Sequence, residues 1–250
     1  ILLDDLEKEY TIKKYTLNTQ KLYGIDKDVE MYNIANHNSN FRGYVILITA
    51  LPDIDQNTTW KKIDSVIVNQ NLIPAEVFKK EFHSKKKIFN QYKLIKKINT
   101  QYYASENCLV EGISFVKYPP VFNLSGEGTA NLSGNIVSYQ EVRKAYQDTY
   151  SDKFPMENKG VFLHHTIKNI YLSAIETINN MKVYRFWTFD DWHDEYGYNY
   201  HRGIDRFAYV EGKGIVGGSY DFYFDFEPAG FKRVAKTEIM WAKELFPEKQ

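Results

Sequence analysis

One run of apolar residues constrains the fold of this chain more than any other feature. Residues 41–51 (FRGYVILITAL) are rich in β-branched side chains, with Asn-rich residues before them and Pro52-Asp53 after them. A continuous apolar run of this length is typical of a strand whose two faces are both buried. The sequence therefore predicts a β-sheet in which 41–51 is an interior strand.

Further strand patterns occur in both halves of the chain. Residues 8–17 contain two alternating runs offset by one residue, which indicates a strand with a β-bulge. Asn179-Asn180 lies between two apolar runs as a hairpin turn would, although the spacing of residues 167–178 also suits a helix, and we favour the hairpin. The remaining predicted strands are 28–34, 62–69, 108–118, 181–189, 205–210 and 215–226, and 181–189 (MKVYRFWTF) has the strongest strand pattern after 41–51.

Three segments show helical spacing. Pro74 suits the first turn of a helix over 74–84, and Ser138 with Glu141 forms a capping box that begins a helix over 138–150. Apolar residues at helical spacing predict a third helix over 231–246. The expected fold class is therefore α+β, predominantly antiparallel β-sheet with about three helices.

The length of the chain and one low-complexity stretch bear on domain organisation. A β-rich chain of 250 residues can form a single domain, and we predict one β-rich domain over 1–250. Residues 123–135 (NLSGEGTANLSGN) are small and polar, and they are either an internal boundary or a long loop.

Charge and cysteine content exclude several classes of protein. Lys and Arg number 32 and so do Asp and Glu, and this zero net charge argues against a nucleic-acid partner. No apolar run approaches the roughly 18–20 residues of a transmembrane helix, so we expect no transmembrane segment. Cys108 is the only cysteine, which excludes an internal disulfide and a cysteine-based zinc cluster. We expect its thiol to be buried and inert, and we expect no cofactor.

Charge is nevertheless uneven along the chain. Residues 79–97 contain eight Lys and one Glu, whereas residues 190–227 contain nine Asp and Glu and three Lys and Arg. The basic stretch could contact anionic lipid or nucleic acid, but most such runs are solvated helix faces. The two stretches could also face each other.

One cluster of residues could hold a metal ion. Residues 190–195 (DDWHDE) are followed by His201, which places two histidines eight residues apart among four carboxylates. Such a cluster could bind a divalent metal, or a carboxylate could orient His193 as a general base. A hydrolase or metal-dependent enzyme centred on His193 and His201 is therefore our alternative function, although no established catalytic motif is present and a solvated acidic loop explains the same residues.

The aromatic residues in the same region suggest a binding surface. Tyr196, Tyr198 and Tyr200 alternate, so they project on one side of a strand, and polar side chains lie between them. Rings supply stacking area and polar groups set orientation, which suits a sugar or a peptide, although aromatic packing within a hairpin would give the same pattern. The predicted ligand-binding residues are Trp192, His193, Asp194, Tyr196, Tyr198 and Tyr200.

Composition suggests where the protein acts. Aromatic residues make up 16% of the chain, which suits a Tyr-rich, β-rich exported protein, although the codons of an AT-rich genome would favour the same abundance. The first residue is Ile1 rather than Met, so we expect a processed or truncated product. Residues 205–224 (DRFAYVEGKGIVGGSYDFYF) resemble the terminal hairpins of bacterial envelope proteins. We expect an exported, non-catalytic protein of the periplasm or cell surface that binds a small molecule, a glycan or a protein partner.

Overall fold

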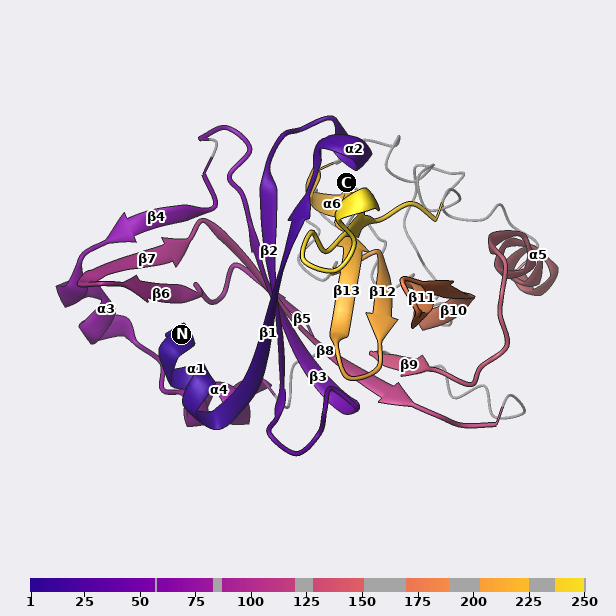
Figure 1. The fold of residues 1–250 in the computed structure, drawn as a ribbon, viewed down its shortest axis with the longest axis horizontal. Coiled ribbons are helices and arrows are strands. Elements are labelled where there is room, and N and C mark those ends of the chain that lie inside the picture. Colours follow the sequence, from indigo (N-terminus) through magenta and orange to yellow (C-terminus); the bar gives the residue numbers. More distant parts are fainter. Residues whose placement is uncertain are drawn as a thin grey trace. The chain divides into compact units, whose positions relative to one another are not determined.

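The computed structural model describes residues 1–56, 58–82, 87–119, 128–150, 170–188, 203–224 and 237–249 (Figure 1). It confirms the predicted class, because the fold is α+β with mainly antiparallel sheets and a few short helices. The chain forms two compact units, and each is described by itself. The first unit contains Ile1–Ile113, Glu211–Gly214 and Met240–Gln250, and the second contains Ser114–Val210 and Ile215–Ile239. The single domain expected from the sequence stays a prediction.

The main sheet of the first unit has the strand order β1-β2-β3-β8-β5. Its strands are β1 (Tyr10–Asn18), β2 (Asp28–Asn36), β3 (Gly43–Leu51), β5 (Lys87–Phe89) and β8 (Asn107–Val116), the last of which continues into the second unit. The strand predicted over 41–51 is confirmed as β3, an interior strand on which Val45 and Leu47 are fully buried. The strands predicted over 28–34 and 108–118 are confirmed as β2 and β8.

The bulge predicted in residues 8–17 is wrong. β1 pairs with β2 residue by residue from Tyr10↔Asn36 to Asn18↔Asp28 with no shift of register. The alternation changes phase because the two halves of the strand bury opposite faces. Tyr10 belongs to the core cluster of the first unit, whereas Leu17, seven residues further along and therefore on the other face, is fully buried outside that cluster.

A smaller sheet of the first unit has the order β4-β7-β6 and is antiparallel. Its strands are β4 (Trp60–Ile63), β6 (Ile95–Ile98) and β7 (Gln101–Ser105), and the helices of this unit are α1 (Leu3–Glu9), α2 (Gln20–Tyr23), α3 (Ser65–Asn71) and α4 (Ala75–Phe82). The helix predicted over 74–84 is confirmed up to Phe82, and residues 83 and 84 lie outside the described residues.

The strand predicted over 62–69 is wrong beyond Ile63, because α3 begins at Ser65. Asp64 caps this helix, since its Oδ1 accepts a hydrogen bond of 2.7 Å from the backbone N–H of Val66. The cap stabilises the first turn, and this outweighs the strand preference of the β-branched residues that follow.

The core of the first unit lies against one face of the main sheet. Its cluster combines Leu6 of α1 and Phe78 of α4 with Ile34, Ile46 and other apolar residues of the sheet. The thiol of Cys108 lies within this cluster, and burial raises its pKa to about 11. The expectation that Cys108 is buried is confirmed, and the expectation that its thiol is inert stays a prediction.

The second unit contains a sheet with the strand order β10-β11-β12-β13. The strands of this sheet are β10 (Ile170–Ile178), β11 (Met181–Thr188), β12 (Arg206–Val210) and β13 (Gly214–Ser219). The chain also forms β9 (Thr129–Asn131), α5 (Tyr139–Tyr150) and α6 (Asp221–Phe224). β9 pairs in parallel with the end of β8. The segment 123–135, predicted to be an internal boundary or a long loop, is described only from residue 128. This described part contains the short strand β9.

Two local predictions in the second unit are confirmed. β10 and β11 form an antiparallel hairpin whose turn residues Asn179 and Asn180 have φ values of 50° and 59°, so the hairpin is right and the helical alternative over 170–178 is wrong. The capping box of α5 is also present. The backbone N–H of Ser138 donates to Glu141 Oε2 at 2.6 Å, and the backbone N–H of Glu141 donates to Ser138 Oγ at 3.2 Å.

The strand predicted over 215–226 ends at Ser219 and is wrong over Asp221–Phe224, which form α6, while residues 225 and 226 lie outside the described residues. The carboxylate of Asp205 accepts hydrogen bonds from the backbone N–H groups of Asp221, at 2.5 Å, and Phe222, at 3.4 Å. These bonds satisfy the first donors of a helix, which a strand would direct elsewhere.

The helix predicted over 231–246 is wrong over 237–246, and residues 231–236 lie outside the described part. Met240–Trp241 is the short strand β14, and Pro247–Lys249 is a 3-10 turn. The segment is extended because β1 supplies hydrogen-bond partners, including Thr16 O, which accepts from Lys243 N–H at 2.9 Å. Within the described residues, no helix has the length and apolar character needed to cross a membrane.

Candidate functional site

The first unit has a polar pocket where β1 ends and β2 begins. Its volume is about 230 Å³. The residues that line it come from three stretches of the chain, 18–28, 52–59 and 243: Asn18, Asp26, Lys27, Asp28, Pro52, Thr59 and Lys243. We call this cavity the polar pocket.

The connection between β1 and β2 holds one wall of the polar pocket in place. α2 ends at Gly24, whose φ of 73° lets the chain reverse without steric cost. Thr19 is fully buried, and its hydroxyl donates to the backbone O of Ile25. Its backbone N–H donates to Lys27 O at 3.0 Å. These bonds fix the segment that carries Asp26 and Asp28.

Asp28 is the centre of the hydrogen bonds in the polar pocket. Its Oδ1 accepts from Lys243 Nζ at 2.6 Å and from Asn18 Nδ2 at 3.3 Å, and Asn18 Nδ2 also donates to Asp26 Oδ1 at 3.1 Å. The hydroxyl of Thr59 donates to the backbone O of Asp28 at 3.0 Å. Within the described residues, Oδ2 of Asp28 accepts no hydrogen bond, so it can accept one from a ligand.

The formal charges of the polar pocket cancel. Two carboxylates, of Asp26 and Asp28, stand against two ammonium groups, of Lys27 and Lys243. A carboxylate only accepts hydrogen bonds and an ammonium group only donates them. The pocket therefore offers both kinds of partner without a net attraction for an ion of either sign.

A charged cluster lies beside the polar pocket on the same face of the main sheet, since Glu30 follows Asp28 by two residues on β2. Glu30 Oε2 accepts from Tyr32 Oη at 2.5 Å and from Lys14 Nζ at 2.8 Å, and Oε1 lies 3.5 Å from Lys96 Nζ. We call these four residues the Glu30 cluster. Burial alone would raise the pKa of Glu30, but these hydrogen bonds and charges outweigh it and hold the pKa below its ordinary value.

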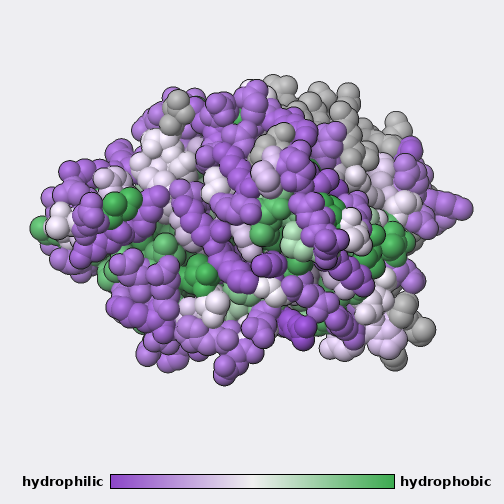
Figure 2. All heavy atoms as spheres, in the orientation of Figure 1, coloured by the Kyte–Doolittle hydropathy of each residue, from purple (hydrophilic) through white to green (hydrophobic). Residues whose placement is uncertain are grey.

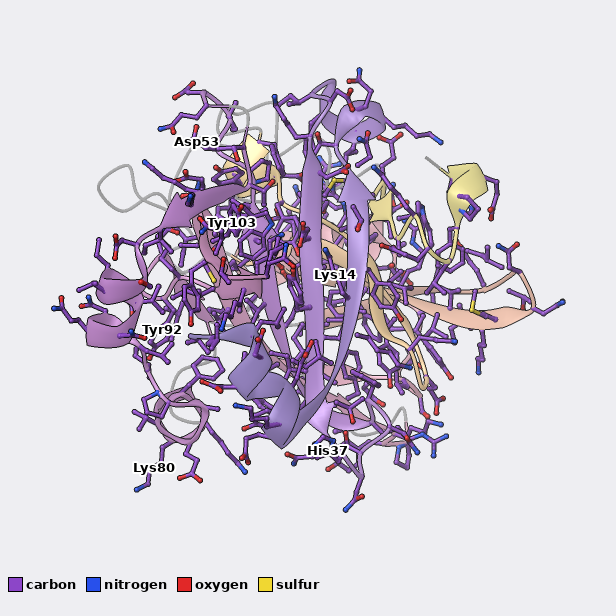
Figure 3. All side chains as sticks on the ribbon, turned by 60° about the vertical axis from the view of Figure 1, so that its left-hand side comes forward. Lys14, His37, Asp53, Lys80, Tyr92 and Tyr103 are labelled. Carbon is purple, nitrogen blue, oxygen red and sulfur yellow. The ribbon has the colours of Figure 1, made fainter. Side chains whose placement is uncertain are left out.

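The Glu30 cluster joins the small sheet to the main sheet. Lys96 is on β6, where it pairs with Tyr103 of β7, and its ammonium group lies 3.9 Å from the ring centroid of Trp60 on β4. Figure 3 shows Lys14 on the main sheet and Tyr103 on the small sheet in this region. Because Thr59 precedes Trp60, the same contacts hold Thr59 against Asp28 at the edge of the polar pocket.

The six residues predicted to bind a ligand lie outside the described residues: Trp192, His193, Asp194, Tyr196, Tyr198 and Tyr200. His201 of the alternative enzyme site also lies outside them. The described part of the chain holds no group of three or more His, Cys, Asp or Glu placed to bind a metal. Both of these predicted sites stay predictions.

The described aromatic residues that flank this predicted surface are buried in the second unit. The rings of Phe186 and Phe207 stack with centroids 5.0 Å apart, and Tyr209 stacks on Phe115 at 3.9 Å. Trp187 is buried as well. Part of the aromatic density between residues 186 and 209 is therefore core packing.

Sequence reasoning did not identify the polar pocket. Its residues come from positions 18–28, 52–59 and 243, and no local motif joins them. The one available signal is the run Asp26-Lys27-Asp28 directly after a glycine-containing turn. No family model matches the chain, and neither the curated proteins nor the solved structures contain a match.

Proposed function

We propose that this protein is a non-catalytic binding protein and that its polar pocket takes a small, uncharged, hydroxyl-rich molecule such as a single sugar ring. The observation that carries this proposal is the carboxylate of Asp28, whose Oδ1 is held by Lys243 and Asn18 and whose Oδ2 accepts no hydrogen bond from the described residues. A hydroxyl group both donates and accepts, so it matches carboxylate and ammonium partners at once.

The size of the polar pocket supports a ligand of this class. Its volume of about 230 Å³ is below the roughly 300–1,000 Å³ of pockets that hold drug-sized molecules. The balanced charges disfavour phosphates and polyamines, which bind best to sites with an excess of the opposite charge. The contacts of Asn18 and Lys243 with Asp28 hold its carboxylate in place before the ligand arrives, which lowers the entropy cost of binding.

The proposal is tested by titrating a panel of common monosaccharides and disaccharides into the protein and its variants by calorimetry. We expect at least one sugar to bind and Asp28→Asn to weaken it at least tenfold, about 1.4 kcal/mol. Asp5→Asn is the matched control, because Asp5 Oδ1 forms a comparable exposed pair with Lys8 at 2.7 Å. We expect this control to bind as the unchanged protein does. Failure of every sugar, or equal losses in the two variants, would overturn the proposal.

The same titration separates the polar pocket from the aromatic and acidic surface expected around Trp192. Trp192→Ala weakens binding if that surface holds the ligand, and it leaves binding unchanged if the polar pocket does. We propose the polar pocket as the principal site, because its residues and contacts are described. A loss confined to Trp192→Ala would move the site to the aromatic surface.

We also propose that the protein acts outside the cytoplasm, in the periplasm or at the cell surface. The single cysteine and the aromatic content of 16% support this setting, because an envelope protein without disulfides needs no cysteine pair. Fractionation of cells expressing the full gene tests it. Recovery in the cytoplasmic fraction would contradict it.

A further inference from the structure

One end of the first unit exposes aliphatic side chains that belong to two neighbouring elements. Val66 and Ile67 of α3 are 59% and 50% exposed, and Ile98 at the end of β6 is 48% exposed. They lie at the same end of the small sheet. β6 turns into β7 at this end, where Ile98 pairs with Gln101. Ile63, the last residue of β4, pairs with the next residue of β7, Tyr102, and α3 begins two residues after Ile63. We call Val66, Ile67 and Ile98 the aliphatic tip.

Exposed lysines lie on the two strands that lead to the aliphatic tip, β4 and β6. Lys61 and Lys62 are exposed on β4, and within the described residues neither forms an ion pair. Lys97 is exposed on β6, where its ammonium group lies over the ring of Tyr102 at 5.5 Å. The nearest carboxylate in sequence, that of Asp64, already accepts from the backbone N–H of Val66. Figure 2 shows green hydrophobic residues among purple hydrophilic ones at the end of the unit where Figure 1 places α3.

We propose that the aliphatic tip docks on the surface of a membrane that contains anionic lipid. Exposed aliphatic side chains flanked by lysines match the boundary between headgroups and acyl chains, where apolar groups enter and ammonium groups meet lipid phosphates. This interaction surface is separate from the polar pocket and goes beyond the proposed sugar binding. The basic stretch over 79–97 contributes Lys97 to it.

The same features argue against a second copy of the chain as the partner. Three aliphatic side chains cannot supply the roughly 1,200–2,000 Å² that a stable protein interface buries. A two-fold contact at the aliphatic tip would also bring Lys61, Lys62 and Lys97 toward their own copies, and like charges repel. An anionic lipid surface satisfies both the charge and the small apolar area.

The proposal is tested by co-sedimentation with vesicles of phosphatidylcholine alone and of phosphatidylcholine mixed with phosphatidylglycerol. We expect binding to the anionic vesicles only, and weaker binding as salt screens the lysines. The double variant Val66→Ser/Ile67→Ser is expected to bind at least tenfold more weakly, and Lys61→Gln/Lys62→Gln several-fold more weakly. All four residues are exposed, so both variants should keep the circular dichroism spectrum of the unchanged protein.

The control variant is Val77→Ser/Lys80→Gln on α4, which removes one exposed aliphatic group and one exposed lysine away from the aliphatic tip. We expect it to bind anionic vesicles as the unchanged protein does. The proposal is overturned if the unchanged protein does not bind these vesicles, or if the control loses as much binding as the tip variants. It is also overturned if Val66→Ser/Ile67→Ser converts a dimer to a monomer in gel filtration, because a second copy would then be the partner.

Discussion

Arg206 and Asp221 form a buried ion pair whose disruption tests the electrostatics of the second unit. Their side chains are 1% and 0% exposed. Arg206 Nη1 donates to Asp221 Oδ2 at 2.7 Å, Nη2 donates to Oδ1 at 3.1 Å, and Nε donates to the backbone O of Glu238 at 2.8 Å. Asp221→Asn keeps the shape of the side chain and removes its charge, so the buried guanidinium group loses the carboxylate of this pair.

The expected cost is about 3–5 kcal/mol, because breaking a buried pair leaves an uncompensated charge. Two other arguments give the same magnitude. Unit charges about 4 Å apart attract by about 4 kcal/mol at an effective dielectric constant of about 20. Hydrogen bonds to charged groups contribute about 1.5–3 kcal/mol each, and this pair has two of them. A loss of this size is a large share of the roughly 5–15 kcal/mol by which a domain is stable.

Urea unfolding measures the loss, and hydrogen exchange of peptides covering β12 and α6 assigns it to the second unit. Glu176→Gln is the matched control, because the side chain of Glu176 is 41% exposed and its Oε1 lies 3.8 Å from Arg185 Nη1. We expect this control to cost less than about 1 kcal/mol. The double variant Arg206→Met/Asp221→Leu should recover most of the loss. The reasoning is refuted if Asp221→Asn costs no more than Glu176→Gln.

Three further changes have outcomes that follow from the first unit. Glu30→Gln should lower the free energy of unfolding by about 1 kcal/mol near neutral pH. Because folding lowers the pKa of Glu30 from 4.5, the stability difference between the two proteins should be complete above pH 4.5 and should vanish as the pH falls through the pKa of the folded state. A stability difference that grows in acid would contradict this. Cys108, with a buried thiol of pKa about 11, should react with a disulfide reagent only on unfolding, and fast labelling of the folded protein would be the opposite result. Gly112→Ala should cost about 1–3 kcal/mol in urea unfolding, because its Cβ would overlap Oη of Tyr44, and an unchanged stability would show that the ring moves aside without cost.

The parts of the fold that the sequence predicted are those whose signal is local. The run over 41–51 indicates an interior strand because burial on both faces leaves no polar positions, and β3 has that environment. The capping box of Ser138 and Glu141 and the turn at Asn179-Asn180 are likewise complete within a few residues. In these segments local preference and tertiary contacts agree.

Two of the errors share a physical cause, since a group distant in sequence supplies the decisive hydrogen bond, whereas α3 is capped by the neighbouring Asp64. The strand predicted over 215–226 ends because the carboxylate of Asp205 caps α6. The helix predicted over 231–246 is absent at Ala242 and Lys243 because these residues pair with Leu17 and Thr16 of β1. The polar pocket is hidden in the same way, because Asn18, Asp28 and Lys243 meet only in the folded chain. Periodicity carries no information about such contacts.

The most direct test of sugar binding in the polar pocket is an NMR titration of the ¹⁵N-labelled protein with the panel of monosaccharides. The account predicts that a bound sugar shifts the backbone amide signals of Asn18, Asp28, Thr59 and Lys243 in a saturable way and that these shifts disappear in Asp28→Asn. Saturable shifts that spare these amides, or an absence of shifts with every sugar at millimolar concentration, would contradict it.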